Sequence, residues 1–143
     1  MRLIEHLIDD TATGAICVYA EGFRDGARFL AAAERCRAAG KPFLLTKVGR
    51  TEAGVRAAKS HTASLAGSYD ALAAACESRG AILCDDPDAM VLAADALARF
   101  GPPPGEGIAV ISPSGGGAGV AVDRIEEAGL ALARLGEATR AAL

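Results

Sequence analysis

The sequence contains no tryptophan, few other aromatic residues and no long apolar run. Aromatic residues make up only 4% of the 143 positions, so platforms on which nucleic-acid bases stack are scarce. The formal net charge is −3, which gives no basic surface for a phosphate backbone. Apolar residues make up 51%, yet no stretch reaches the roughly 18 residues needed to cross a bilayer. We therefore expect neither nucleic acid nor membrane among its partners.

Metal-binding cysteine motifs are also missing. The four cysteines include no Cys-x-x-Cys pair and have no histidine close in sequence, so we expect no metal site and interpret the thiols as buried and apolar. The N-terminus carries acidic residues where a signal peptide needs an apolar stretch, which favours a cytoplasmic protein and disfavours disulfides. The cysteines are Cys17, Cys36, Cys76 and Cys84.

Short apolar runs alternate with segments of helical periodicity. The runs have the length and composition of strands buried on both faces, as in a parallel sheet. We expect strands at 14–20, 43–46 and 81–84, helices at 3–8, 25–39, 68–78 and 87–100, and a long loop at 47–67. This alternation predicts an α/β fold, a doubly wound parallel sheet with helices on both faces.

The segment 101–107 is the sharpest break in composition, because it holds three consecutive prolines among glycines. We expect it to link a first domain, 1–100, to the start of a second α/β domain at 108–143. That second segment predicts a strand at 108–111, a glycine-rich turn and a helix at 120–128. It is too short to bury a core, so we interpret it as incomplete.

Ligands of open α/β sheets bind at the carboxyl ends of the strands, which directs attention to the loop 47–67. This loop surrounds His61 with basic residues, glycines and hydroxyls, a setting suited to anions. A neutral imidazole can accept a phosphoryl group when an acceptor holds its second nitrogen, and Glu21, after the neighbouring predicted strand, is the candidate acceptor. The alternative for His61 is a loop histidine that only hydrogen-bonds backbone groups. The alternative for Glu21 is a carboxylate that is merely solvated.

A second candidate for anion binding follows the predicted strand at 108–111. Ser114, Gly115 and Gly116 stand between that strand and a helix, where backbone N–H groups can converge on a phosphate. The glycine order is not that of the dinucleotide fingerprint, and no Walker lysine follows. A tight turn without a ligand is the alternative.

Three segments together resemble the α portion of ADP-forming acetyl-CoA synthetases and, more distantly, the α chain of succinyl-CoA synthetase. They are Lys47-Val-Gly-Arg-Thr-Glu-Ala-Gly54, Ser60-His-Thr-Ala-Ser-Leu-Ala-Gly67 and the Ser-Gly-Gly turn at 114–116. The likeness covers nearly the whole chain. The sequence departs from the usual pattern at Ala63, where glycine is common, and at Pro113, where asparagine is common.

The resemblance implies a flavodoxin-like, succinyl-CoA synthetase-like domain with a phosphorylated histidine. It places that histidine at His61 and the glutamate that steadies it at Glu21. The phosphate-binding positions it implies are Ser114, Gly115, Gly116, Gly49 and Gly54.

The reaction implied by the resemblance joins an acid and CoA at the expense of ATP, giving acyl-CoA, ADP and phosphate. It implies ATP or ADP with Mg²⁺ and CoA in the complete enzyme, with no permanently bound cofactor. The expected partners are a CoA-binding Rossmann domain, an ATP-grasp domain or subunit and a small carboxylic acid, in an oligomer. We do not expect these 143 residues to turn over alone.

Two other hypotheses remain open on the sequence. One is a regulatory or scaffolding domain that senses CoA or acyl-CoA without being phosphorylated. The other is a degenerate remnant that only folds and pairs with a partner. The sequence of these residues does not determine which acid is used or whether the nucleotide is ADP or GDP.

Overall fold

A computed structural model describes residues 1–59 and 68–142. The chain divides into two compact units, Met1–Gly101 and Pro102–Leu143. In the described part of the chain, no helix is long and apolar enough to span a membrane.

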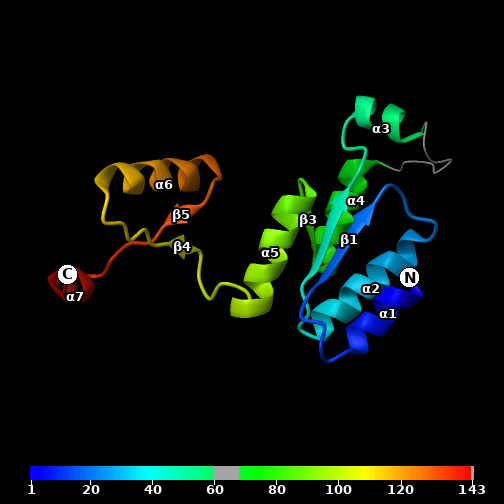
Figure 1. The fold of residues 1–143 in the computed structure, drawn as a ribbon, viewed down its shortest axis with the longest axis horizontal. Helices are drawn as coiled ribbons and strands as arrows, with labels where there is room; N and C mark the ends of the chain where they lie inside the picture. The colour runs from blue at the N-terminus through cyan, green and yellow to red at the C-terminus, as the bar shows by residue number, and fades with distance from the viewer. Residues whose placement is uncertain (60–67, 143) are drawn as a thin grey trace. The chain divides into compact units, whose positions relative to one another are not determined.

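The first unit is a three-stranded parallel sheet covered by helices on both faces (Figure 1). The strands stand in the order β1-β2-β3, and α5 packs on one face while α1, α2 and α4 build the layer on the other. The expected doubly wound α/β fold is confirmed. The elements are α1 (Arg2–Asp9), β1 (Ile16–Ala20), α2 (Gly26–Ala38), β2 (Phe43–Lys47), α3 (Glu52–Lys59), α4 (Tyr69–Arg79), β3 (Ala81–Cys84) and α5 (Pro87–Phe100).

Side-chain caps fix where the helices begin. The carboxylates of Asp25 and Asp86 accept the backbone N–H of Arg28 at 2.9 Å and of Ala89 at 2.8 Å. Such caps satisfy backbone donors that the first helical turn leaves free, so the helix starts of α2 and α5 were visible in the sequence. The expected loop at 47–67 was wrong in part, because α3 forms within it.

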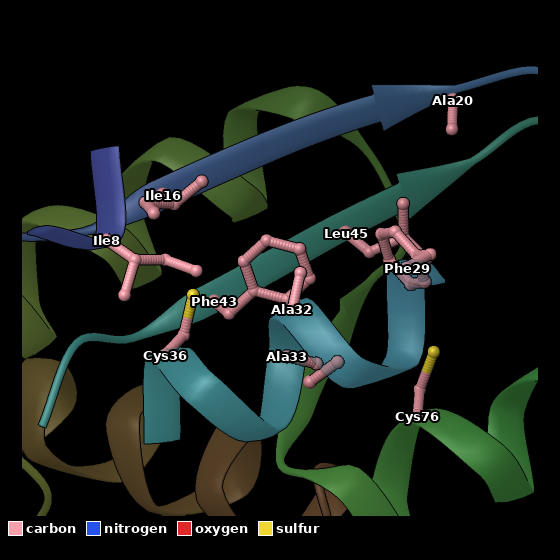
Figure 2. Close-up of a cluster of buried hydrophobic side chains, with 11 residues drawn as sticks. Ile8, Ile16, Ala20, Phe29, Ala32, Ala33, Cys36, Phe43, Leu45 and Cys76 are labelled. Atoms are coloured by element: carbon pink, nitrogen blue, oxygen red, sulfur yellow. The ribbon is translucent and has the colours of Figure 1, made fainter. Parts of the chain in front are cut away.

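The larger core lies between the sheet and the helices α1, α2 and α4. Phe29, Phe43 and Leu45 are fully buried, and the rings of Phe29 and Phe43 have centroids 5.3 Å apart. Figure 2 shows the Phe29 and Phe43 side chains lying between the α2 backbone and β2. Full burial of a side chain of this size contributes about 1.5–3 kcal/mol to the stability of the fold.

The other face of the sheet is packed more sparsely. Leu44, Cys84 and Met90 form a small cluster under α5, and the Thr46 hydroxyl donates to the backbone oxygen of Asp86 at 3.1 Å. Cys17 shares this face and is exposed. The expectation of four buried thiols was therefore wrong for Cys17, which is exposed although α5 packs on the same face of the sheet.

The second unit consists of short elements. Its two strands pair in parallel and are exposed, and none of its described residues is buried. Gly107 allows the strands to approach, because a Cβ atom there would lie 2.9 Å from the Ala133 Cα. The elements are β4 (Gly107–Ile108), α6 (Gly115–Glu127), β5 (Ala131–Leu132) and α7 (Glu137–Ala142).

Two expectations for the second unit were wrong. The strand expected at 108–111 has only the residues Gly107–Ile108 and is not buried. The helix expected from residue 120 begins at Gly115, because the Ser114 hydroxyl accepts the N–H of Gly117 at 3.2 Å and caps the helix there. The glycines expected in a turn therefore belong to the first turn of α6.

Candidate functional site

The carboxyl ends of β1 and β2 lie side by side at one edge of the first unit's sheet. Ala20 at the end of β1 is in register with Lys47 at the end of β2. The Val48 N–H continues the ladder by donating to the Ala20 carbonyl oxygen at 3.0 Å. This edge is where open parallel sheets bind ligands, because loops from neighbouring strands converge there.

Glu21 leaves the end of β1 and is exposed at this edge. It lines a hollow of about 860 Å³ together with neighbours in sequence and apolar side chains of α1 and β1. The wall includes Ile4, Val18, Tyr19, Phe23 and Arg24. The partner expected for Glu21, His61, lies outside the described residues, so the role of Glu21 stays a prediction.

Lys47 brings a half-buried ammonium to the same edge. Its Nζ donates to the backbone oxygen of Val48. Burial lowers the pKa of Lys47 below its ordinary value, and the nearby charge of Glu21 acts in the opposite direction. The ammonium is therefore partly stripped of water and lies within the electrostatic range of the Glu21 carboxylate.

The turn between β2 and α3 brings Gly49 and Gly54 together. Gly49 has φ +83°, a left-handed conformation that favours glycine, and a Cβ on Gly54 would lie 3.3 Å from the Gly49 Cα. The Gly54 N–H donates to the Thr51 hydroxyl at 3.1 Å. The phosphate-binding role expected for these two glycines stays a prediction, and the Gly54 N–H already has a partner within the turn.

A cluster beside this turn was not recognised in the sequence. Arg50 forms an ion pair with Asp85, which follows β3, and its guanidinium carbon lies 5.5 Å from the centre of the Tyr69 ring. A hollow of about 400 Å³ runs past it, lined also by Thr51, Arg56 and Ser68. Asp85 was a detectable signal, because it directly follows a predicted strand as Glu21 does.

Ser114, Gly115 and Gly116 belong to the second unit, at the start of α6. The Ser114 N–H donates to the Ser112 hydroxyl at 3.1 Å, and the Ser114 hydroxyl caps the helix. Both glycines are exposed and contribute N–H groups to the positive end of a helix of 13 residues. This is the geometry of an anion cradle, and its occupation by phosphate stays a prediction.

Residues 1–59 and 68–142 contain no group of three side chains placed to hold a metal ion. The described side chains at the sheet edge supply a carboxylate on Glu21, an ammonium on Lys47 and a guanidinium on Arg50. Such a set binds and orients anionic groups and accepts hydrogen bonds from a nearby imidazole.

The sequence model of one domain family, described as the succinyl-CoA ligase like flavodoxin domain, matches residues 1–97. The α subunit of ADP-forming acetate–CoA ligase II from Pyrococcus furiosus is 38% identical over 138 residues, which cover 96% of this chain and 30% of that protein. The α subunit of ADP-forming acetate–CoA ligase I from the same organism is 40% identical over 131 residues, or 91% of this chain and 28% of that protein.

A solved structure is similar across both units. It is dinucleotide forming acetyl-coenzyme A synthetase 1 from Candidatus Korarchaeum cryptofilum, in complex with phosphate and ADP. It matches with a TM-score of 0.79 and 34% identity, covering 94% of this chain and 29% of that chain. The chain thus spans less than a third of the length of the relatives it matches.

Proposed function

Because this chain belongs to the family of the succinyl-CoA ligase like flavodoxin domain, we propose that it forms part of an ADP-forming acyl-CoA ligase. The resemblance seen in the sequence motifs is confirmed at the level of the family. The observation that carries the proposal is that the family match spans 1–97 and contains the sheet edge with Glu21. The acid, which is acetate in the names of the relatives, is a small carboxylic acid here.

His61 carries the phosphoryl group in this proposal. Phosphate attacks the acyl-CoA thioester carbonyl, the C–S bond breaks and CoA leaves with an acyl phosphate formed. An imidazole nitrogen of His61 then attacks phosphorus, the bond to the acyl oxygen breaks and the carboxylate leaves. ADP takes the phosphoryl group in the last step, and the reverse direction activates the acid.

Glu21 accepts a hydrogen bond from the second imidazole nitrogen in this scheme. A carboxylate in that place fixes the tautomer and stabilises the positive charge that develops as the ring becomes phosphorylated. Its position at the end of β1, exposed beside a hollow, supports this role. The proposal gives phosphate-binding roles to Ser114, Gly115 and Gly116 in the second unit and, separately, to Gly49 and Gly54 in the first.

The remaining steps belong to parts that the relatives carry beyond the region this chain covers. We propose a CoA-binding Rossmann domain and an ATP-grasp domain or subunit as partners, in an oligomeric cytoplasmic enzyme. Mg²⁺ bound with the nucleotide would offset the negative charge of its phosphates, and none of the described residues is proposed as its ligand. The 143 residues alone are expected to be inactive.

Uptake of label from γ-labelled ATP tests whether His61 carries the phosphoryl group. We expect the complete enzyme to take up γ-phosphate in an acid-labile, alkali-stable form, and His61→Ala to lose at least nine tenths of the label. His6→Ala is the matched control, because His6 is the other histidine of the chain and is exposed on α1. Label that persists in the His61→Ala enzyme would contradict the assignment of His61 as the phosphoryl carrier. A wild-type enzyme that binds CoA yet takes up no label favours the sensing alternative.

A further inference from the structure

The strand β1 lies at one side of the first unit's sheet, and in the part of the chain that the structure describes it pairs with β2 alone (Figure 1). The Ile16 N–H donates to a backbone oxygen just before β2 at 2.9 Å, and the Ala20 oxygen accepts from the N–H just after β2 at 3.0 Å. Backbone direction alternates along a strand. The N–H and carbonyl groups of Cys17 and Tyr19 therefore point away from β2 and form an open edge of β1.

The sequence of β1 has none of the features that protect an unpaired edge. Edge strands that stay unpaired commonly carry charged residues, proline or a bulge, because their free backbone groups otherwise attract further strands. The five residues Ile16–Ala20 contain no charge and no proline, and they pair with β2 in an unbroken register. Such a sequence is typical of a strand with neighbours on both sides.

The hollow of about 860 Å³ lies beside the carboxyl half of β1, where residues 18–20 line it. Its apolar wall includes Ile4 of α1 and Phe23 of the β1–α2 connection, and both side chains are half-buried. The charged residues of the lining, Glu21 and Arg24, come after the end of the strand. The space next to β1 on this face is therefore bordered by apolar side chains.

The other face of the sheet is apolar at this edge as well. The side chains of Cys17 and Tyr19 alternate with those of Val18 and Ala20, which contribute to the core on the α2 side. Cys17 is exposed, and Tyr19 is 59% exposed. A strand placed beside β1 would thus meet apolar surface on both of its faces, as the strands of buried parallel sheets do.

We propose that the open edge of β1 binds an extended apolar strand of polypeptide, supplied by the remainder of the proposed ligase. The free backbone groups of Cys17 and Tyr19, spaced by about 6.6 Å along the strand, bond to its backbone, and the hollow receives its side chains. The matched region is less than a third of each relative's length, so the relatives have other polypeptide to supply such a strand. The source of the strand rests on the proposed function, whereas the open edge does not.

Amide hydrogen exchange at single-residue resolution is the first test, with the dilute 143-residue chain compared with the complete enzyme. We expect the Cys17 and Tyr19 amides to exchange at least 100-fold more slowly in the complete enzyme, because the added strand accepts their hydrogen bonds. The Val18 amide, which points toward β2, is the matched control and should be protected in both samples. Amides of Cys17 and Tyr19 that exchange equally fast in both samples overturn the inference. Slow exchange already in the dilute chain also overturns it, because the edge is then covered by this chain or by a second copy.

Proline at position 19 is the second test. Tyr19→Pro removes the outward N–H and leaves the bonds to β2 in place, whereas Tyr19→Ala removes the side chain and keeps the N–H. In the complete enzyme, Tyr19→Pro should speed exchange of the Cys17 amide at least tenfold, and Tyr19→Ala should change it by less than about threefold, with the Val18 amide reporting that the sheet is intact. Equal effects of the two variants overturn the inference.

The two proposals fail separately. An enzyme that takes up label from ATP while its Cys17 and Tyr19 amides exchange freely overturns the added strand and leaves the proposed function standing. Protected amides in an enzyme that takes up no label support the added strand and count against the phosphoryl carrier.

Discussion

The two units of the chain share a topology of parallel strands joined through helices, but only one of them has an interior. In the described residues, every buried side chain belongs to Met1–Gly101. The strands of the first unit have helices on both faces, whereas β4 and β5 are two residues long and exposed. The difference shows that apolar side chains become buried only where helices and strands of sufficient length pack against each other.

The second unit instead presents apolar side chains to solvent. Ile111 is 97% exposed and Val120 is 64% exposed. Apolar residues scattered over a unit of this size gain little from folding by themselves. We therefore expect the cooperative stability of the chain to reside in the first unit, and three experiments test this difference.

The same substitution in a strand of each unit should have the largest effect. Leu45→Ala in β2 removes a fully buried side chain and should lower the free energy of unfolding by about 2–5 kcal/mol. Leu132→Ala in β5, where the side chain is 37% exposed, should change it by about 0.5 kcal/mol or less. Urea unfolding followed by circular dichroism measures both. Equal losses would mean that the second unit has a core of its own.

Removing a helix cap from each unit should have a smaller effect. Asp86→Ala deletes the acceptor for the Ala89 N–H in α5 and should cost about 1 kcal/mol in the main transition. Ser114→Ala deletes the corresponding acceptor in α6 and should leave the main transition unchanged while lowering helical content. A shift of the main transition by Ser114→Ala would show that the two units unfold together.

The smallest effect should be a pH-dependent one in the first unit. Arg28 donates two hydrogen bonds of 2.8 Å to Glu5, linking α2 to α1, and these lower the pKa of Glu5 below its ordinary value. A lowered carboxylate pKa stabilises the fold above the unfolded pKa, and this contribution disappears as the pH falls through the folded value. The Tm difference between wild type and Glu5→Gln should therefore narrow from pH 6 to pH 3.

A pair in the second unit serves as the control for this measurement. Arg124 and Glu127 are 2.8 Å apart on one turn of α6, so their contact joins no separate elements. Glu127→Gln should leave the main Tm unchanged at both pH values. A wild-type advantage over Glu5→Gln that stays constant down to pH 3 would contradict the role given to Arg28.

The sequence predicted the first unit well because its signals are local. Apolar runs, the caps Asp25 and Asp86 and the left-handed Gly80 each fix an element boundary without help from distant residues. The helix α3 escaped prediction because Gly54 lies within it and glycine disfavours helix. The glycines at the start of α6 misled the prediction for the same reason, since the Ser114 cap outweighed their low propensity.

The candidate site was predicted only in part. Glu21 and Lys47 could be placed at one edge because each follows a predicted strand, and the carboxyl ends of parallel strands meet at the same edge of a sheet. The Arg50, Asp85 and Tyr69 cluster could not, because it depends on side-chain directions across three connections. The exposure of Cys17 likewise depends on which side chains pack around it in three dimensions, which periodicity does not encode.

The close approach of Gly49 and Gly54 has a consequence for mutational tolerance. Any side chain at position 54 meets the backbone of residue 49, and any at position 49 must accept a left-handed backbone. A scan of all substitutions should therefore find Gly49 and Gly54 sensitive, whereas the exposed residue Ala53 between them accepts change. The two positions are also coupled, because a side chain at position 54 fits only if the backbone at residue 49 moves away from it.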